Sequence, residues 1–228
     1  MVLLEQEDPA CRDHFQASYD LAERIGDQSR QADAACGLGN AYVRVPGLRD
    51  LDQAQRWHER DLALTPEQDR IGRAATHGSL ANVAYERFGD ARAVGAPGEH
   101  LVAYLDQAHA GHQQVLDLLP DDHHEYRATA HRQLGKIRSE FGDVPGANQH
   151  YQQAVRHDEA RGNTYGAGVT RFYVALLLAG NERADDALLY ARAALANFQQ
   201  VGRGAASEAV DAEALIRALE RILAAPLS

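Results

Sequence analysis

Five of the eleven histidines lie within residues 109–131, and histidine is a common ligand of transition metals near neutral pH. If residues 118–121 form a turn, the first and last of them lie at similar heights on neighbouring antiparallel helices, within reach of a two- or three-histidine metal site. No HExxH motif, cysteine or convergent set of carboxylates accompanies them, so packing histidines are the favoured interpretation and no cofactor is predicted. The five are His109, His112, His123, His124 and His131.

Motifs for other chemistry are missing from the sequence. It contains no Walker A sequence, no G-x-S-x-G and no G-x-G-x-x-G after a strand-like segment. The "GLG" of Gly37 to Gly39 lies within a helical pattern. We therefore do not expect an enzyme, although an active site on a helical scaffold stays an alternative.

Charge and hydropathy argue against some kinds of partner and some cellular locations. A net charge of -10 and a pI near 5.5 argue against a general nucleic-acid binder, which needs a basic surface. No segment approaches 18 apolar residues, and "MVLLEQEDPA" lacks the basic start of a signal peptide, so a cytoplasmic protein without membrane attachment is expected. Lys136 is the single lysine among 23 basic residues, a bias typical of GC-rich coding, which suggests a bacterial source.

The two cysteines, Cys11 and Cys36, lie in helical patterns at different distances from the turn expected near Gly26. A disulfide needs Cα atoms within about 7 Å, so both are predicted to be free, small core residues.

The elements that position these residues repeat along the chain. Residues 131–155 give a template: Leu134-Gly135, then a Gly-Asp step, then small and aromatic residues at helical spacing. Five anchors of this pattern are separated by 43, 54, 39 and 40 residues: Cys11, Ala54, Ala108, Ala147 and Ala187. Helical hairpins at a near-fixed period predict an α-solenoid in which each hairpin packs on the next.

The predicted fold is a single all-α domain, a right-handed α-solenoid with a capping helix at its C-terminal end. Asp8-Pro9 is expected to start the first helix, and capping boxes are expected at Thr65–Gln68 and Asp122–Glu125. Residues 1–7 form either a rudimentary cap or a join to a longer chain. The insertion around residues 90–103 predicts a lengthened helix pair rather than a mobile flap beside the groove. The expected elements are a lone helix over 8–26, hairpins at about 28–64, 66–118, 122–161 and 164–201, and the capping helix over 205–224.

The pattern over residues 10–200 resembles the tetratricopeptide repeat (TPR) family. The resemblance rests on Leu-Gly-xx-Tyr at 38–42, Gly-Asp at 142–143 and Ala-xxx-Tyr-xx-Ala at 147–154. The period near 40 residues, Ala81-Asn82 in place of Leu-Gly and Arg138 at the tyrosine position depart from the family pattern. Long-period repeats of this kind resemble the sensor arrays of bacterial regulators. The resemblance implies that a protein or peptide binds a concave groove lined by the first helix of each hairpin.

Carried over position by position, the resemblance places sixteen residues in that groove. A partner with an acidic group or C-terminal carboxylate is implied, held by Asn40, Arg44, Arg87, Arg132 and Lys136. The alternative is a solvated face in which these charges pair with Glu86 and Glu140. Glu86 and Glu140 are themselves groove positions. The remaining nine are Cys36, Val43, Ser79, Val83, Ser139, Phe172, Leu176, Ala179 and Gly180, of which Phe172 and Leu176 make the fourth hairpin's face apolar.

Two other functions stay open at this level. One is an accessory or catalytic protein that binds a small molecule in the groove or at the histidine-rich turn. The other is a self-associating scaffold, for example a homodimer, that uses the unpaired first helix.

Overall fold

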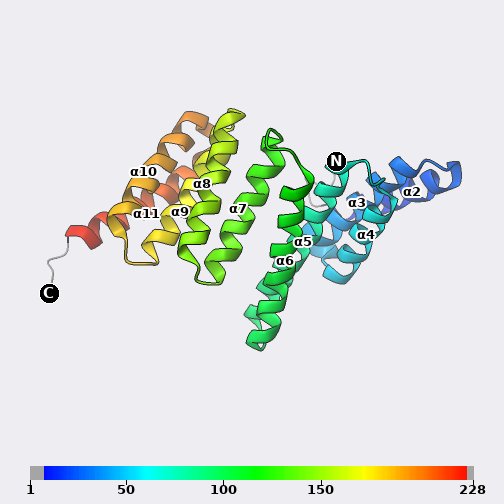
Figure 1. Cartoon of the computed structure of the whole chain (residues 1–228), viewed down its shortest axis with the longest axis horizontal. Coiled ribbons are helices and arrows are strands. Elements are labelled where there is room, and N and C mark those ends of the chain that lie inside the picture. The colour runs from blue at the N-terminus through cyan, green and yellow to red at the C-terminus, as the bar shows by residue number, and fades with distance from the viewer. Residues whose placement is uncertain (1–7, 225–228) are drawn as a thin grey trace. The chain divides into compact units, whose positions relative to one another are not determined.

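The computed structural model describes residues 8–224, and all regular structure within them is helical (Figure 1). The predicted all-α class is confirmed: within each unit, successive helices pack side by side as neighbouring pairs. Residues 1–7, for which either a cap or a join to a longer chain was considered, lie outside the described part of the chain. The chain divides into two compact units, Met1–Pro120 and Asp121–Ser228.

In the described part of the first unit, one helix is followed by two hairpins. A short 3-10 turn, Pro46–Leu48, joins the two helices of the first hairpin. The helices are α2 (Ala10–Ile25), α3 (Gln28–Arg44), α4 (Leu51–Leu64), α5 (Arg70–Ala93) and α6 (Gly98–Leu118).

The second unit contains two hairpins and a final helix. Ala212 and Leu219 of that helix are buried against clusters formed by the preceding hairpin, so it covers the end of the unit as a capping helix should. A 3-10 turn, Gly202–Ala205, leads into it. The helices are α7 (His124–Glu140), α8 (Val144–Ala160), α9 (Thr164–Ala179), α10 (Ala184–Val201) and α11 (Ala206–Ala224).

The Gly-Asp step works as the sequence predicted. Gly142 has a φ of 74°, the left-handed conformation that ends α7, and the Asp143 carboxylate accepts a hydrogen bond from the Gly146 N–H at 2.9 Å. The same device, a left-handed glycine followed by a capping side chain, recurs at Gly26-Asp27 and Gly162-Asn163. These steps fix where one helix ends and the next begins.

Both predicted capping boxes are wrong. The side chain that caps α5 is Asp69, which accepts from the Gly72 N–H, whereas Thr65 ends α4 and donates its hydroxyl to the Asp61 carbonyl. The N-cap of α7 is His123, whose side chain makes no capping hydrogen bond. Asp122 accepts from the His124 N–H through its backbone carbonyl rather than through its side chain.

The small residues of the repeat let helices approach closely. All five predicted anchors are at most 2% exposed. A Cβ added to Gly135 would lie 2.6 Å from Cδ1 of Tyr151, so the tyrosine ring rests directly on the glycine. His58 packs on Gly39 in the equivalent place of the first hairpin.

The insertion is a lengthened helix pair, as predicted, rather than a flap. α5 and α6 run for 24 and 21 residues and extend beyond α3 and α4 (Figure 1). Residues 94–97 join them, and Val94 is 82% exposed.

Two smaller predictions can be checked on the same residues. Cys11 and Cys36 are free thiols, the first buried and the second half-buried. Within residues 8–224 no helix combines the length and apolarity needed to cross a bilayer.

Candidate functional site

Two of the predicted binding residues lie one turn apart on α3. Arg44 is exposed and forms no ion pair with any residue of the described chain. Asn40 is half-buried, and its amide nitrogen lies 3.5 Å from the sulfur of Cys36. Arg44 is therefore available to an external anion, whereas Asn40 already contacts a neighbouring side chain.

Arg87, the third predicted residue of the first unit, is bound to α4. Its guanidinium forms a 2.6 Å ion pair with Asp52 and also hydrogen-bonds the Gln55 side chain and the Leu51 carbonyl. Glu86, which the solvated-face alternative paired with these arginines, instead bonds Arg49 at 3.2 Å. Arg87 consequently tethers α5 to α4.

One groove position in this unit is contradicted by the structure. Val83 was expected to face the groove but is only 1% exposed. α5 packs against both α4 and α6, and this burial covers the face on which Val83 lies.

In the second unit Lys136 lies over an aromatic ring of the next hairpin. Its Nζ is 4.6 Å from the centre of the Tyr173 ring, a cation–π distance that joins α7 to α9. No carboxylate of the described residues pairs with Lys136. Leu176, one turn further along α9, is 44% exposed. Lys136 and Leu176 occupy positions that the TPR resemblance assigned to the groove. Tyr173, which it did not assign there, lies at cation–π distance from Lys136 and one turn before Leu176 on α9.

Phe172, the other apolar groove position, is partly buried within the second unit. It packs against the cluster of Phe198, Ala205 and Ala212, the last of which belongs to α11. The capping helix therefore covers Phe172 in part and leaves Leu176 exposed.

Arg132 is placed in a buried ionic network. Its Nη2 lies 2.5 Å from Oδ2 of Asp158, a side chain with 0% exposure, and its Nε donates to the Thr170 hydroxyl at 2.8 Å. Arg161 and Asn163 bind the other carboxylate oxygen of Asp158. This network links α7, the end of α8 and α9, so Arg132 has a structural partner within the fold.

The histidines pair differently from the arrangement considered for the sequence cluster. His124 and His131 of α7 face His157 and His150 of α8, with 3.0 Å between the Nδ1 atoms of each pair. The rings of His131 and His157 are stacked at 5.7 Å. Burial, with smaller effects from His150 and His157, lowers the pKa of His131 to about 4.

A register argument could have identified these pairs. Both helices carry their histidines seven residues apart, two helical turns, and α7 and α8 form one hairpin. In an antiparallel pair 131 matches 150 and 124 matches 157, because both sums are 281. His112 is a buried packing residue at 2% exposure, as predicted.

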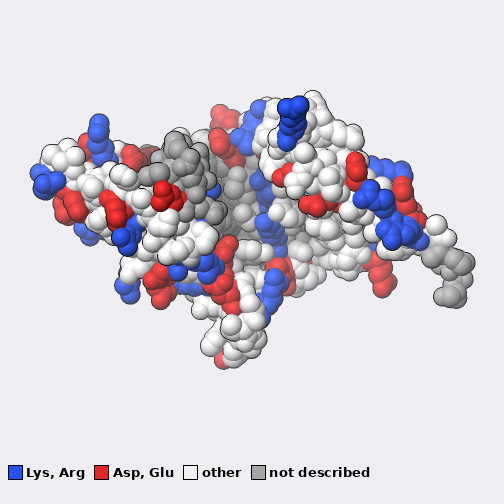
Figure 2. Space-filling view, turned by 180° about the vertical axis from the view of Figure 1, so that it is seen from behind, with Lys and Arg blue, Asp and Glu red and all other residues white. Residues whose placement is uncertain are grey.

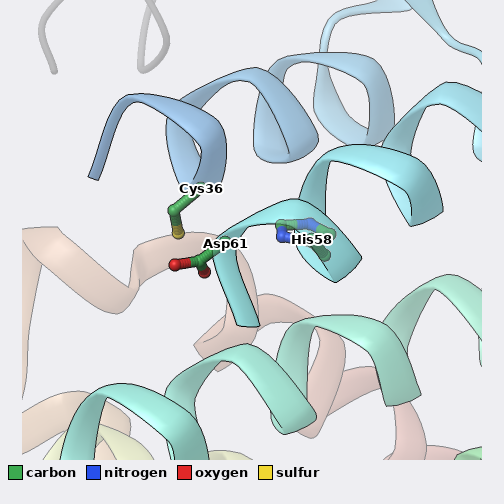
Figure 3. A group of neighbouring side chains, drawn as sticks. All are labelled: Cys36, His58 and Asp61. Carbon is green, nitrogen blue, oxygen red and sulfur yellow. The ribbon is translucent and has the colours of Figure 1, made fainter. Parts of the chain in front are cut away.

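The first hairpin holds a cluster that the sequence did not reveal. Cys36 of α3 faces Asp61 of α4, with His58 one turn earlier on α4 (Figure 3). One ligand atom from each of the three side chains lies within 4.8 Å of the other two. No short motif marks the cluster, because Cys36 is 22 residues before His58.

Burial dominates the ionisation of this cluster. It raises the pKa of the Cys36 thiol to about 11, with smaller contributions from Asp61 and Asp33. It lowers the pKa of His58 to about 4 and raises that of Asp61. A neutral thiol beside a neutral imidazole is a poor nucleophile, so the arrangement does not favour cysteine catalysis.

Charged side chains of both signs are interspersed over the face drawn in Figure 2. The second unit has exposed ion pairs, such as Arg183 with Asp186 at 2.6 Å and Arg192 with Glu220 at 2.8 Å. Such pairs contribute little stability and keep the surface solvated.

Comparisons with known proteins support the fold and leave the family open. No protein-family model matches the chain, and no curated protein matches its sequence. The crystal structure of BtubC (BKLC) from P. vanneervenii is similar with a TM-score of 0.69 and 15% identity, over 97% of this chain and 91% of that one. The crystal structure of MamA protein is similar with a TM-score of 0.52 and 14% identity, over 84% of this chain and 93% of that one. These likenesses confirm a helical-repeat fold, whereas membership of the TPR family stays a prediction.

Proposed function

We propose that this chain binds a protein or peptide partner in its second unit, on the surface formed by α7 and α9, the first helices of the two hairpins there. The observation that carries the proposal is the contact of Lys136 with Tyr173 beside the exposed Leu176. In this role the chain would serve as an adaptor or as the sensing part of a bacterial regulator.

The chemistry of these three residues specifies the partner. The Lys136 ammonium has no anionic partner among residues 8–224 and can bind a carboxylate, either acidic or C-terminal. Leu176 and the Tyr173 ring offer apolar area to an aliphatic or aromatic side chain next to that carboxylate. The preferred ligand is therefore a peptide that ends in, or contains, an apolar residue adjoining an acidic group.

Arg44 is a separate candidate contact for an anionic group, in the first unit. It is exposed and unpaired in the described chain, and Asn40 lies one turn before it on α3. Arg87 and Arg132 are left with supporting roles, because their guanidinium groups bind Asp52 and Asp158 within the protein.

A peptide library displayed with free C-termini tests the proposal and selects the preferred ligand sequence in the same experiment. We expect enrichment of sequences with an apolar residue beside a carboxylate, and at least tenfold weaker binding of the selected peptides to Lys136→Glu and to Leu176→Glu. Arg203→Glu makes the same charge change at an exposed residue of the second unit and should bind like the wild type. Equal binding by Lys136→Glu, or no enrichment, would refute the proposal.

Self-association through α2 is a second candidate function. Leu21 and Ile25 on α2 are 51% and 62% exposed. They line a groove of about 540 Å³ between α2 and α3, together with Phe15. Sedimentation velocity should then show concentration-dependent dimers that Leu21→Glu abolishes and Leu189→Glu, at a 66% exposed site on α10, does not. A monomer at all concentrations would exclude this candidate.

A further inference from the structure

Three side chains of the first hairpin have the identities and spacing of a metal site. Cys36, His58 and Asp61 offer sulfur, nitrogen and oxygen atoms within 4.8 Å of one another (Figure 3). Tetrahedral Zn²⁺ with bonds of roughly 2.0–2.3 Å holds such atoms about 3.4–3.6 Å apart. Small side-chain rotations on two packed helices would bring the three donors to that separation.

His58 is the observation that points to a ligand. Its side chain is 1% exposed, and neither ring nitrogen has a hydrogen-bond partner in the described chain. A buried polar atom without a partner costs free energy, so native proteins almost always satisfy it. A metal ion bound between Cys36 and Asp61 would take one of these nitrogens.

Neighbouring side chains already orient the other two donors. The Thr76 hydroxyl donates to Oδ2 of Asp61 at 2.8 Å. The Thr65 hydroxyl, which donates to the Asp61 carbonyl at 2.9 Å, lies 3.2 Å from Oδ1 of the same residue. The Asn40 amide lies 3.5 Å from the Cys36 sulfur, where it can donate to a thiolate. Metal ligands in proteins are commonly held by hydrogen bonds of this kind.

We propose that Cys36, His58 and Asp61 form a binding site for a divalent transition-metal ion, with Zn²⁺ the ion that this mixed ligand set fits best. Three protein ligands leave a fourth position for water or for a group of another molecule. Of the three ligands, Cys36 is half-buried, whereas His58 and Asp61 are buried. The site is independent of the Lys136 surface and lies in the other unit.

Cobalt titration of the reduced, chelator-stripped full chain tests the site. A thiolate bound to Co²⁺ gives a near-ultraviolet charge-transfer band, whereas the histidine pairs of α7 and α8 contain no sulfur and cannot contribute to it. We expect this band to saturate at one Co²⁺ per chain and to disappear when Zn²⁺ is added. It should be lost in Cys36→Ala and kept in Cys11→Ala, the matched control at the other free cysteine.

Two further variants test the remaining ligands. His58→Gln and Asp61→Asn should each weaken Co²⁺ binding at least tenfold, with folding checked by circular dichroism. Cys36→Ala changes a small, half-buried side chain and will fold, so it decides the matter if either of the others does not. Absence of the band in the wild type, or its persistence in Cys36→Ala, would overturn the proposal.

Discussion

Arg132 of α7 and Asp158 of α8 form an ion pair of 2.5 Å in which the carboxylate is wholly buried. Removal of one partner of a buried ion pair costs about 3–5 kcal/mol. In this pair Arg161 would remain bound to the other oxygen of Asp158 at 3.2 Å, so the lower end of that range applies. We expect Arg132→Met to lower the free energy of unfolding by about 3 kcal/mol, since the Arg132 side chain keeps 18% exposure. Urea unfolding measures the change. Arg183→Ala, which breaks an exposed pair with Asp186, should change it by less than about 1 kcal/mol, and equal losses in the two variants would contradict this account.

The close contact at Gly135 predicts opposite effects of two Gly→Ala substitutions. In Gly135→Ala the new Cβ would lie 2.6 Å from the Tyr151 ring, so we expect a loss of about 1–3 kcal/mol from overpacking. Gly89 of α5 has no atom within 4 Å of the equivalent position. There alanine should raise stability by about 0.5–1 kcal/mol through its helix propensity. Thermal unfolding of both variants measures the sign, and destabilisation by Gly89→Ala as well would show that contact is not the cause.

The buried histidines predict a loss of stability in acid. Burial lowers the pKa of His112 to about 4, with a smaller effect from His109, so the unfolded chain takes up a proton at this residue first as the pH falls below about 6.5. The stability due to neutral His112 is complete above pH 6.5 and is lost as the pH falls toward 4, by about 2 kcal/mol at pH 5. Urea unfolding between pH 7 and 4.5 should show a shallower pH dependence in His112→Leu than in the wild type. His14→Leu, at an exposed site, should keep the wild-type slope, and an unchanged slope in His112→Leu would refute the argument.

The start of α5 predicts which side chain matters at the Thr65–Asp69 turn. Asp69 accepts the hydrogen bond from the Gly72 N–H, so Asp69→Ala should cost about 1 kcal/mol. Gln68 belongs to the capping box expected from the sequence but makes no cap, and Gln68→Ala should change stability by less than about 0.5 kcal/mol. Chemical denaturation of the two variants compares them. A larger loss of stability in Gln68→Ala than in Asp69→Ala would contradict this account and support the capping box predicted from the sequence.

Local pattern was enough to predict the helices and their closest contacts. Ala147 and Tyr151 were assigned to a packed face from spacing alone, and both are buried; Gly142 and Asp143 end and begin helices as their chemistry requires. These features depend on residues within a few turns of one another. The same reasoning confused Thr65 with Asp69, because both are good cap residues and the turn between them decides which one is used.

The side-chain contacts at the candidate sites depend on how neighbouring helices pack, which the hydrophobic periodicity of the sequence does not determine. Arg132 could be placed at a first-helix position from the repeat, but its partner Asp158 comes from the end of the next helix. Cys36 and Asp61 meet because α3 and α4 pair in one particular register. The histidine pairs were within reach of sequence reasoning, had the register of α7 and α8 been applied to His150 and His157.

The tip of the long α5–α6 pair is a suitable site for inserting a tag. At 1.5 Å per residue the first helix of the pair is about 36 Å long, roughly 15 Å more than the 14 residues of α4. The turn at its tip contains Gly95 with a φ of 69°, and no atom lies within 4 Å of an added Cβ there. An epitope or fluorophore inserted at residues 95–96 would therefore lie beyond the end of α3, which carries Cys36 and Arg44. The overhang offers a point at which the first unit can be anchored to a sensor chip away from the buried side chains of His58 and Asp61.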